Sequence, residues 1–570
     1  MAKFNLSEVF RPRLFEILRS GTYDKQTFVS DLIAGIIVGI VALPLAIAFG
    51  IASGVSPQQG LITAVVAGFL ASLFGGSDFL IGGPTGAFIV IVYGVVSQYG
   101  ISGLIIATFL AGIMLVLMGV FKLGTIIKFI PYPIVVGFTS GIAVVIFSTQ
   151  IKDFLGLTIA DMPSGFIPQW GAYLTHLDTV NVYETLLGIL CLATIILWPK
   201  VTRKIPGSLI AIIVGIAASL LLKYFAGIEF ATIGSKFPEL ASGIEIPKPT
   251  TPQISWDTVQ NMFQPAFTIA LLCAIESLLA AMVADGVTGK RHNSNTELIG
   301  QGIANIFTPF FGGIPATGAI ARTMTNINNG GKTPMVGIIH AVVLLLIFLF
   351  LMPYAIYIPL ACLAAILVIV AYNMSEWRTF KYLLKGDKAD VAVLLITFFL
   401  TVIIDLTVAI EIGLVMAIIL FVKRVSETST IRIFEDSKVA GTENDEMAQL
   451  GDIEHLIVPQ GVEIYEIDGP FFFGLASKLD ELDRDLKKKN IKVRIIRMRK
   501  VPFIDSTGLN NLRNLWMRSK REGVQIVLSG VNEKVHSSLH KAGFANEIGE
   551  EFIYPHIIPA LAKATELVEK

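Results

Sequence analysis

The first 425 residues of this 570-residue chain consist largely of apolar stretches, each long enough to cross a bilayer as a helix. One crossing needs about 20 apolar residues. Uninterrupted candidate spans lie at residues 31–53, 57–74, 101–119, 133–151, 181–198, 207–226, 262–284, 297–310, 334–352, 355–373, 389–404 and 407–424. Two further segments, 78–98 and 311–328, are interrupted by Gly and Pro. With both included, the sequence predicts fourteen crossings, an even number that places the two ends of this region on one side of the membrane.

The charged residues are concentrated in the rest of the chain. Only 15% of all residues are Asp, Glu, Lys or Arg, yet 43 of these 88 residues lie among the last 145. A soluble domain normally carries roughly 25%. This split excludes a soluble globular protein, a disordered chain and a nucleic-acid-binding protein, and it favours a polytopic α-helical membrane domain followed by a soluble domain. We expect an N-terminal segment at 1–30, a transmembrane domain at 31–425 with halves of about 31–226 and 262–425, a linker at 426–460, and a soluble domain at 461–570.

Basic residues predict the orientation. The loops expected on the side of the charged tail carry Lys or Arg, whereas the long loops on the other side, 152–180 and 227–260, hold only one and two Lys. Positive charge accumulates in cytoplasmic loops. We therefore expect a bacterial inner-membrane protein with both termini in the cytoplasm.

The soluble tail alternates between strand-like and helix-like segments. VEIYEIDG, KVRIIRMR and VQIVLSG read as strands, and helices are expected at 475–489, after VPFIDSTG as far as Glu522, and in two stretches toward the C-terminus. This alternation predicts a compact α/β domain. The three cysteines, Cys191, Cys273 and Cys362, lie inside apolar runs without metal-ligand spacing, so we expect no disulfide, no bound metal and no cofactor.

The two interrupted segments share one pattern. FLIGGPTGAFIVIVYGVVSQ contains Gly82-Gly83 and Pro84, and FFGGIPATGAIARTMTNIN contains Gly312-Gly313 and Pro315. A helix opening at Pro84, a residue that suits the first helical position, and ending near Ser97 would be roughly 20 Å long, too short to cross the membrane. A second short helix is expected to open at Thr317-Gly318 and to end near Asn328. Each must therefore begin near mid-membrane.

By the crossing count the two short helices run in opposite directions, with their N-terminal ends facing each other. Free N–H groups there, together with the Thr85 and Thr317 hydroxyls, would attract an anion. Broken helices in inverted repeats are typical of transporters. The alternative, that each Gly-Pro pair is only a kink, is less favoured because the two are matched.

Two charged residues lie at membrane depth. Glu276 is the only charged residue between Asp257 and Asp285, and a carboxyl group in apolar surroundings favours its neutral form. That is the property a proton-coupling residue needs, although a purely structural carboxyl bonded to a neighbouring helix is the alternative. Arg322 lies five residues after Thr317, where it could pair with Glu276, attract the anion or extend to the membrane surface.

These motifs resemble those of the sulfate permease (SulP) family of anion transporters. The residues that carry the resemblance are PLAIAFGIASG, GGPTGA, AIESLL, PATGAIARTMTNINNGGKTP and, in the tail, IDSTGL. Within the family the sequence is most similar to the enterobacterial C4-dicarboxylate transporters, through GFTSGIAVVIFSTQIKDFLGL, NSNTELIGQG and AYNMSEW. The resemblance covers nearly the whole chain.

The resemblance implies a fold of seven plus seven inverted repeats divided into core and gate domains, with a cytoplasmic STAS domain and a homodimeric assembly. It implies elevator-type alternating access. The substrate site it implies lies between the two short helices, under Phe49, with donors from Thr85, Gly86, Gly318 and Ala319, and with Thr317 and Arg322 beside them. It further implies the lipid bilayer as surroundings and acyl carrier protein as a soluble partner of the STAS domain.

Two departures from the family pattern bear on coupling and substrate. Sodium-coupled bicarbonate members have Asp at the position of Glu276 and Thr four residues later, where this chain has Ala280. The missing hydroxyl makes a poorer sodium site, so we expect a co-transported proton rather than sodium. Several animal members carry Gln where this chain has Leu45, which weakens any inference about a substrate contact there.

In the tail, Thr507 aligns with the phosphorylated Ser of anti-anti-sigma factors, which makes Thr507 and Ser506 candidate regulatory phosphosites. The alternative is that Asp505 or Ser506 only caps the following helix. The sequence thus predicts a proton-coupled symporter of C4-dicarboxylates such as succinate, fumarate or aspartate, and not an enzyme. A bicarbonate or sulfate transporter of the same family, or a STAS-linked sensor with little transport, remain the alternatives.

Overall fold

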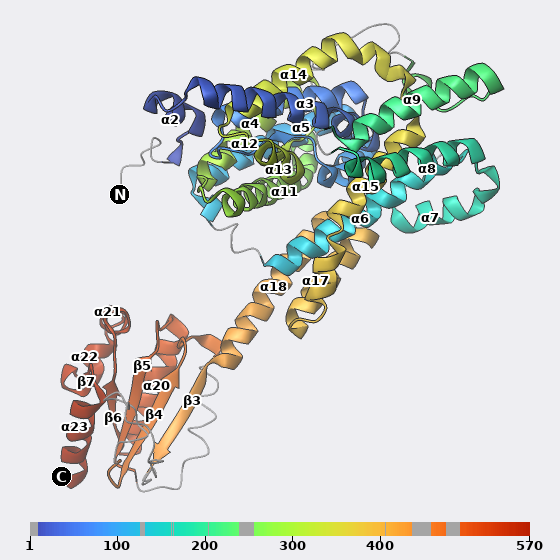
Figure 1. The fold of residues 1–570 in the computed structure, drawn as a ribbon. Coiled ribbons are helices and arrows are strands. Elements are labelled where there is room, and N and C mark those ends of the chain that lie inside the picture. Colours follow the sequence, from blue (N-terminus) through green and yellow to red (C-terminus); the bar gives the residue numbers. More distant parts are fainter. Residues whose placement is uncertain are drawn as a thin grey trace. The chain divides into compact units, whose positions relative to one another are not determined.

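The computed structural model describes residues 9–125, 131–160, 162–163, 165–202, 205–238, 256–404, 406–435, 458–474 and 491–570 (Figure 1). The chain divides into two compact units, Met1–Ala417 and Ile418–Lys570. Parts of three predicted elements lie outside the described residues: the loop at 227–260, the linker at 426–460 and the helix at 475–489.

The first unit is helical, and most of its helices lie where the sequence predicts spans. Nine helices of the described residues are long and apolar enough to cross a membrane. The exact number of crossings, fourteen by sequence, remains a prediction. In the first half the elements are α2 (Arg13–Ser20), α3 (Lys25–Ala52), α4 (Pro57–Phe74), β1 (Gly82–Gly83), η1 (Gly86–Phe88), α5 (Ile89–Val120), α6 (Tyr132–Leu155), α7 (Phe166–Thr175), α8 (Val182–Leu197) and α9 (Gly207–Ala226). In the second half they are α10 (Ile233–Lys236), α11 (Trp256–Thr288), α12 (Ser294–Phe307), β2 (Thr317–Gly318), α13 (Ile320–Asn328), α14 (Met335–Leu351), α15 (Leu360–Met374), α16 (Trp377–Leu383), α17 (Lys388–Ile403) and α18 (Leu406–Thr428).

The long helices of this unit pack in two groups. In one, α12 packs against α4 and α5, α11 against α5, and α14 against α3 and α4; we call these the core helices. In the other, α15 packs against α6 and α8, α17 against α6, and α8 against α9; we call these the gate helices. Small residues permit close contact between α5 and α12, since a Cβ on Gly302 of α12 would lie only 2.7 Å from the Gly112 carbonyl oxygen of α5.

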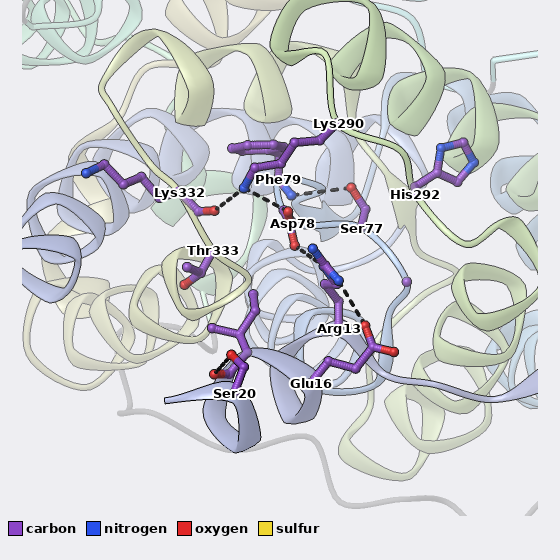
Figure 2. A network of polar contacts seen from close by, with 12 residues as sticks. Arg13, Glu16, Ser20, Ser77, Asp78, Phe79, Lys290, His292, Lys332 and Thr333 are labelled. Carbon is purple, nitrogen blue, oxygen red and sulfur yellow. Dashed lines mark hydrogen bonds and ion pairs between the residues drawn. The ribbon is translucent and has the colours of Figure 1, made fainter. Parts of the chain in front are cut away.

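A polar network joins four segments of the core (Figure 2). The buried Asp78 carboxylate accepts from Arg13 Nε at 2.6 Å and pairs with Lys290 Nζ at 2.9 Å, and Lys290 Nζ also donates to the Lys332 carbonyl at 3.4 Å. The hydrogen bond to Asp78 raises the pKa of Arg13 further above its ordinary value, so the guanidinium stays charged. The network thus connects α2 to three core segments, those that contain Asp78, Lys290 and Lys332, and holds the four segments together.

The second unit is an α/β domain, as predicted. Its sheet has the order β3-β4-β5-β6-β7, with β3 antiparallel to β4 and the other pairs parallel. The strands are β3 (Thr430–Glu435), β4 (Val462–Asp468), β5 (Val493–Lys500), β6 (Gln525–Ser529) and β7 (Ile553–Tyr554), and the helices are α20 (Ser506–Arg521), α21 (Glu533–Lys541), α22 (Phe544–Ile548) and α23 (Ile557–Glu569). Helices cover both faces: Tyr465 and Ile496 pack with Leu512 of α20, while Ile464 and Ile495 pack with Ala560 of α23.

The expected linker at 426–460 is wrong in its first part. α18 continues to Thr428, and β3 at 430–435 pairs with β4 at the edge of the sheet. Ile431 and Ile433 of β3 pack against the domain core, a two-residue alternation that the surrounding charged residues conceal. Residues 436–457 of the expected linker lie outside the described part of the chain.

Candidate functional site

The two interrupted segments meet as a pair of very short strands. β1 and β2 pair in antiparallel fashion, with Gly82 opposite Gly318 and Gly83 opposite Thr317. Because the strands are antiparallel, the helices that follow them leave the pair in opposite directions, as the sequence predicts. Gly83 adopts φ +147°, and a side chain there would collide with the Arg322 guanidinium, so this position requires glycine.

Both helices begin later than the sequence predicts. Thr85 is the N-cap of η1, which starts at Gly86 and continues into α5, so Pro84 lies before the helix rather than at its first position. The first short helix ends at Gly100, where φ is 68° and the backbone leaves the helical conformation. In the second segment Ala319 is the N-cap and α13 starts at Ile320. Strand pairing explains the shift, because Thr317 and Gly318 belong to β2.

This shift changes which backbone groups are available to an anion. Gly318 N donates to Ser277 Oγ at 3.0 Å and Ala319 N to the Ile81 carbonyl at 2.9 Å, so neither predicted donor of the second helix is free. The first N–H groups of a helix have no acceptor within it. In the described part of the chain, the groups without an acceptor include the N–H groups of Gly86 and Ala87 at one helix start and of Ile320 and Ala321 at the other. The predicted donor Gly86 is retained.

The two threonines differ in their surroundings. Thr317 Oγ1 is buried and donates to the Cys273 carbonyl at 3.0 Å while contacting Ser277 Oγ at 2.7 Å, so it holds β2 against α11. Thr85 is half-buried, and its hydroxyl donates to Glu276 Oε2 at 3.0 Å. Of the two predicted threonines, therefore, only Thr85 is accessible at a helix start, whereas the Thr317 hydroxyl is buried.

Arg322 binds backbone rather than a carboxylate. Its side chain is 1% exposed, and its guanidinium donates to the Gly82 carbonyl at 3.2 Å and to the Pro84 carbonyl. Among the described residues it forms no ion pair with Glu276, and it does not extend to the surface. Arg322 thus fixes the break before the first short helix from the second repeat, and it places a full positive charge behind the helix starts.

Phe49 lies beside Gly86, as the family resemblance implies. A Cβ on Gly86 would lie 3.5 Å from Phe49 Cε1, 3.3 Å from Ile146 Cδ1 and 2.8 Å from Met374 Sδ. Phe49 belongs to the core helix α3, whereas Ile146 and Met374 belong to the gate helices α6 and α15. The start of the first short helix is therefore a point of contact between core and gate, which the sequence alone does not reveal.

Two cavities open next to this contact. One of about 190 Å³ is lined by Ala48, Tyr93 and Leu363, among others, and the second, of about 370 Å³, is lined by Ile89, Gln98 and Gln264. Both reach Tyr93 and lie between α5 and the gate helix α6. On the second repeat, Ile320 at the start of α13 is 40% exposed. The first short helix thus borders open space between core and gate, and the start of the second is exposed.

In the soluble domain, Asp505 caps α20 by accepting from Gly508 N at 2.6 Å, while Ser506 and Thr507 are exposed in its first turn. The capping role, which was the alternative interpretation, accounts for Asp505. Phosphorylation at Ser506 or Thr507 remains a prediction.

Comparison with known families gives two matches. The model of the "Sulfate permease family" matches residues 28–397, and that of the "STAS domain" matches residues 455–564.

Individual proteins agree with these matches. The "Putative sulfate transporter YvdB" of Bacillus subtilis is 43% identical, over 94% of this chain and 97% of its own length, and the "Bicarbonate transporter BicA" of Synechocystis is 30% identical, over 89% and 88%. The solved transmembrane domain of a cyanobacterial BicA is 31% identical, with a TM-score of 0.60 over 70% of this chain and 98% of that one. The structure of SLC26A9, at 18% identity, has a TM-score of 0.82 over 97% of this chain and 93% of that one.

Proposed function

The chain belongs to the sulfate permease family, and we propose that it imports a small inorganic oxyanion, sulfate or bicarbonate, across a bacterial plasma membrane. The chain is a multi-pass anion transporter with a C-terminal STAS domain. The relatives compared above are named as transporters of sulfate and bicarbonate, and none is named as a dicarboxylate transporter. The expectation of C4-dicarboxylate specificity is therefore replaced by its alternative.

The observation that carries this proposal is the meeting of two helix starts over a buried arginine. Each helix N-terminus is equivalent to about +0.5 charge. With the full charge of Arg322, the site carries about +2 when Glu276 is neutral and about +1 when Glu276 is ionised. The site therefore attracts an anion more strongly when Glu276 is neutral, whether the anion is sulfate or bicarbonate.

Glu276 supplies the coupling in this proposal. Its carboxyl accepts a hydrogen bond from the hydroxyl of Thr85, the N-cap of the first short helix. The residue after Thr85 is Gly86, whose N–H is free, so the protonation site of Glu276 lies close to the proposed anion donors. An ionised carboxylate there repels an incoming anion, and a neutral one does not. Binding of the anion and protonation of Glu276 therefore favour each other, which makes the two cargoes travel together. Ala280 is buried against Leu80 and Ala281 and offers no side-chain oxygen for sodium.

Movement of the core relative to the gate is proposed as the transport step. The core is internally fixed by the network around Asp78 and by the Arg322 hydrogen bonds across β1 and β2. Its contact with the gate near Gly86 involves the flexible side chain of Met374, and two cavities lie farther along α5 between core and gate. This arrangement suits an elevator motion in which the intact site crosses the membrane.

The test is uptake by purified protein in liposomes. Labelled sulfate, bicarbonate and succinate are supplied in turn, with and without an inward proton gradient and with and without sodium, and protein-free liposomes serve as the blank. The proposal predicts uptake of sulfate or bicarbonate that rises with the proton gradient and is indifferent to sodium. Uptake of succinate alone would overturn the substrate assignment, and uptake that requires sodium would overturn the coupling.

A further inference from the structure

Two histidines and a glutamate converge on the surface of the second unit. His536 and His540 lie one helical turn apart on α21, so their side chains share a face of the helix. Glu550 opens the short helix η10 (Glu550–Phe552), which directly precedes β7. His540 Nε2 lies 2.6 Å from Glu550 Oε1, and His536 Nε2 lies 3.4 Å from Glu550 Oε2.

The three groups have the geometry of a metal-binding set. One nitrogen from each imidazole and one carboxylate oxygen all lie within 4.8 Å of one another, and the two ring centroids are 4.7 Å apart. Metal–nitrogen and metal–oxygen bonds to zinc are about 2.0–2.2 Å long, so one ion can contact all three after small side-chain rotations. The side chains are 40%, 46% and 49% exposed, which leaves a path for the ion and a position for water.

The ligand types restrict the metal. Magnesium and calcium prefer oxygen ligands throughout, whereas two imidazoles with one carboxylate suit zinc, nickel or copper. A pair of histidines spaced by four residues on a helix holds two ligands on one rigid element, so only Glu550 must be brought to them. The alternative is a surface pair of His–Glu contacts without any ion.

We propose that His536, His540 and Glu550 form a binding site for a divalent transition-metal ion of the zinc type, with three protein ligands and one open position. Bound metal links α21 to the segment that leads into the edge strand β7. Metal binding therefore restrains this part of the STAS domain, a role separate from the anion site.

The full-length protein, purified in detergent with a tag that contains no histidine and stripped with a chelator, is titrated with zinc chloride in a calorimeter near neutral pH. We expect one ion per chain. His536→Ala and His540→Ala each weaken binding by at least about tenfold, because loss of even an outer-shell partner costs 10–100-fold. His556→Ala, which removes an exposed histidine of the same unit outside the cluster, is the matched control and leaves binding unchanged.

Two further measurements keep the outcome independent of variant folding. Cobalt added to the wild type should give a visible absorption spectrum of a site with nitrogen and oxygen ligands, and zinc should slow amide exchange in α21 and η10. Thermal melting without metal checks that each variant is folded. Absence of binding in the wild type, or undiminished binding in the folded His536→Ala and His540→Ala variants, would overturn the proposal.

Discussion

Adding one methyl group at Gly86 tests whether this position is the contact between core and gate. In Gly86→Ala the new Cβ lies 2.8 Å from Met374 Sδ and 3.3 Å from Ile146 Cδ1, whereas unstrained contacts lie at about 3.5–4.0 Å. Overpacking of this kind costs about 1–3 kcal/mol. Since only the conformation with core and gate in contact is penalised, the balance between conformations shifts by about 5- to 150-fold.

The controls separate this effect from others. Gly94→Ala lies in the same helix, where a Cβ meets nothing within 4 Å, so it gains helix propensity of up to about 1 kcal/mol without a clash. The double variant Gly86→Ala/Met374→Ala removes the sulfur that the new methyl group meets. Met374→Ala alone is the second single variant that completes the double-mutant cycle.

The assay is the initial rate of labelled-anion uptake in liposomes at equal protein content. We expect Gly86→Ala to be at least fivefold slower than the wild type, Gly94→Ala to be within about twofold, and the double variant to recover most of the rate. The contact would be refuted if Gly86→Ala took up the anion at the wild-type rate. It would also be refuted if adding Met374→Ala to Gly86→Ala failed to restore the uptake rate. In the second case the methyl group acts on the anion rather than on the gate.

Two further predictions concern stability. Arg322→Met leaves the buried Gly82 and Pro84 carbonyls without their donor, and hydrogen bonds from charged groups contribute about 1.5–3 kcal/mol each, so the thermal midpoint in detergent should fall. Because the variant also removes a positive charge behind the helix starts, anion uptake should slow as well. An unchanged midpoint would contradict the role of Arg322 in holding the break. Asp505→Ala removes the cap of α20 at a cost of about 1 kcal/mol, so amide exchange in the first turns of α20 should become about fivefold faster in the full chain. Ser506→Ala, the neighbouring control, should leave this exchange rate unchanged. Equal exchange rates in the two variants would contradict the capping role of Asp505.

The sequence alone was sufficient to predict a helical membrane domain, the C-terminal α/β domain and the two opposed breaks. Long apolar stretches leave few alternatives in a membrane, because the backbone must satisfy its hydrogen bonds within the helix. The repeated Gly-Gly and Pro pattern located the two breaks to within a few residues, but it did not predict that Thr317 and Gly318 form a strand rather than the start of a helix. These features are local, and local patterns are what a sequence displays directly.

What the sequence could not show depends on contacts between distant segments. The start of α13 at Ile320 rather than Thr317 follows from pairing with Gly82 and Gly83, more than 230 residues earlier. Arg322 was expected to pair with Glu276, to attract the anion or to extend to the surface, and its guanidinium instead donates to carbonyl groups of the opposite repeat. Ser277, adjacent to Glu276, was overlooked; its position one residue after the only charged residue of the span was the available signal.

The most direct test of the account is transport by Glu276→Gln, which keeps the shape of the side chain and an oxygen to accept from Thr85 but cannot change its protonation. Two quantities are measured in liposomes: accumulation of labelled anion under an inward proton gradient, and exchange of labelled for unlabelled anion without a gradient. Glu411→Gln, at an exposed carboxylate of α18, is the control. The account predicts that Glu276→Gln loses accumulation and retains exchange, whereas accumulation equal to that of the wild type would contradict a coupling role for Glu276.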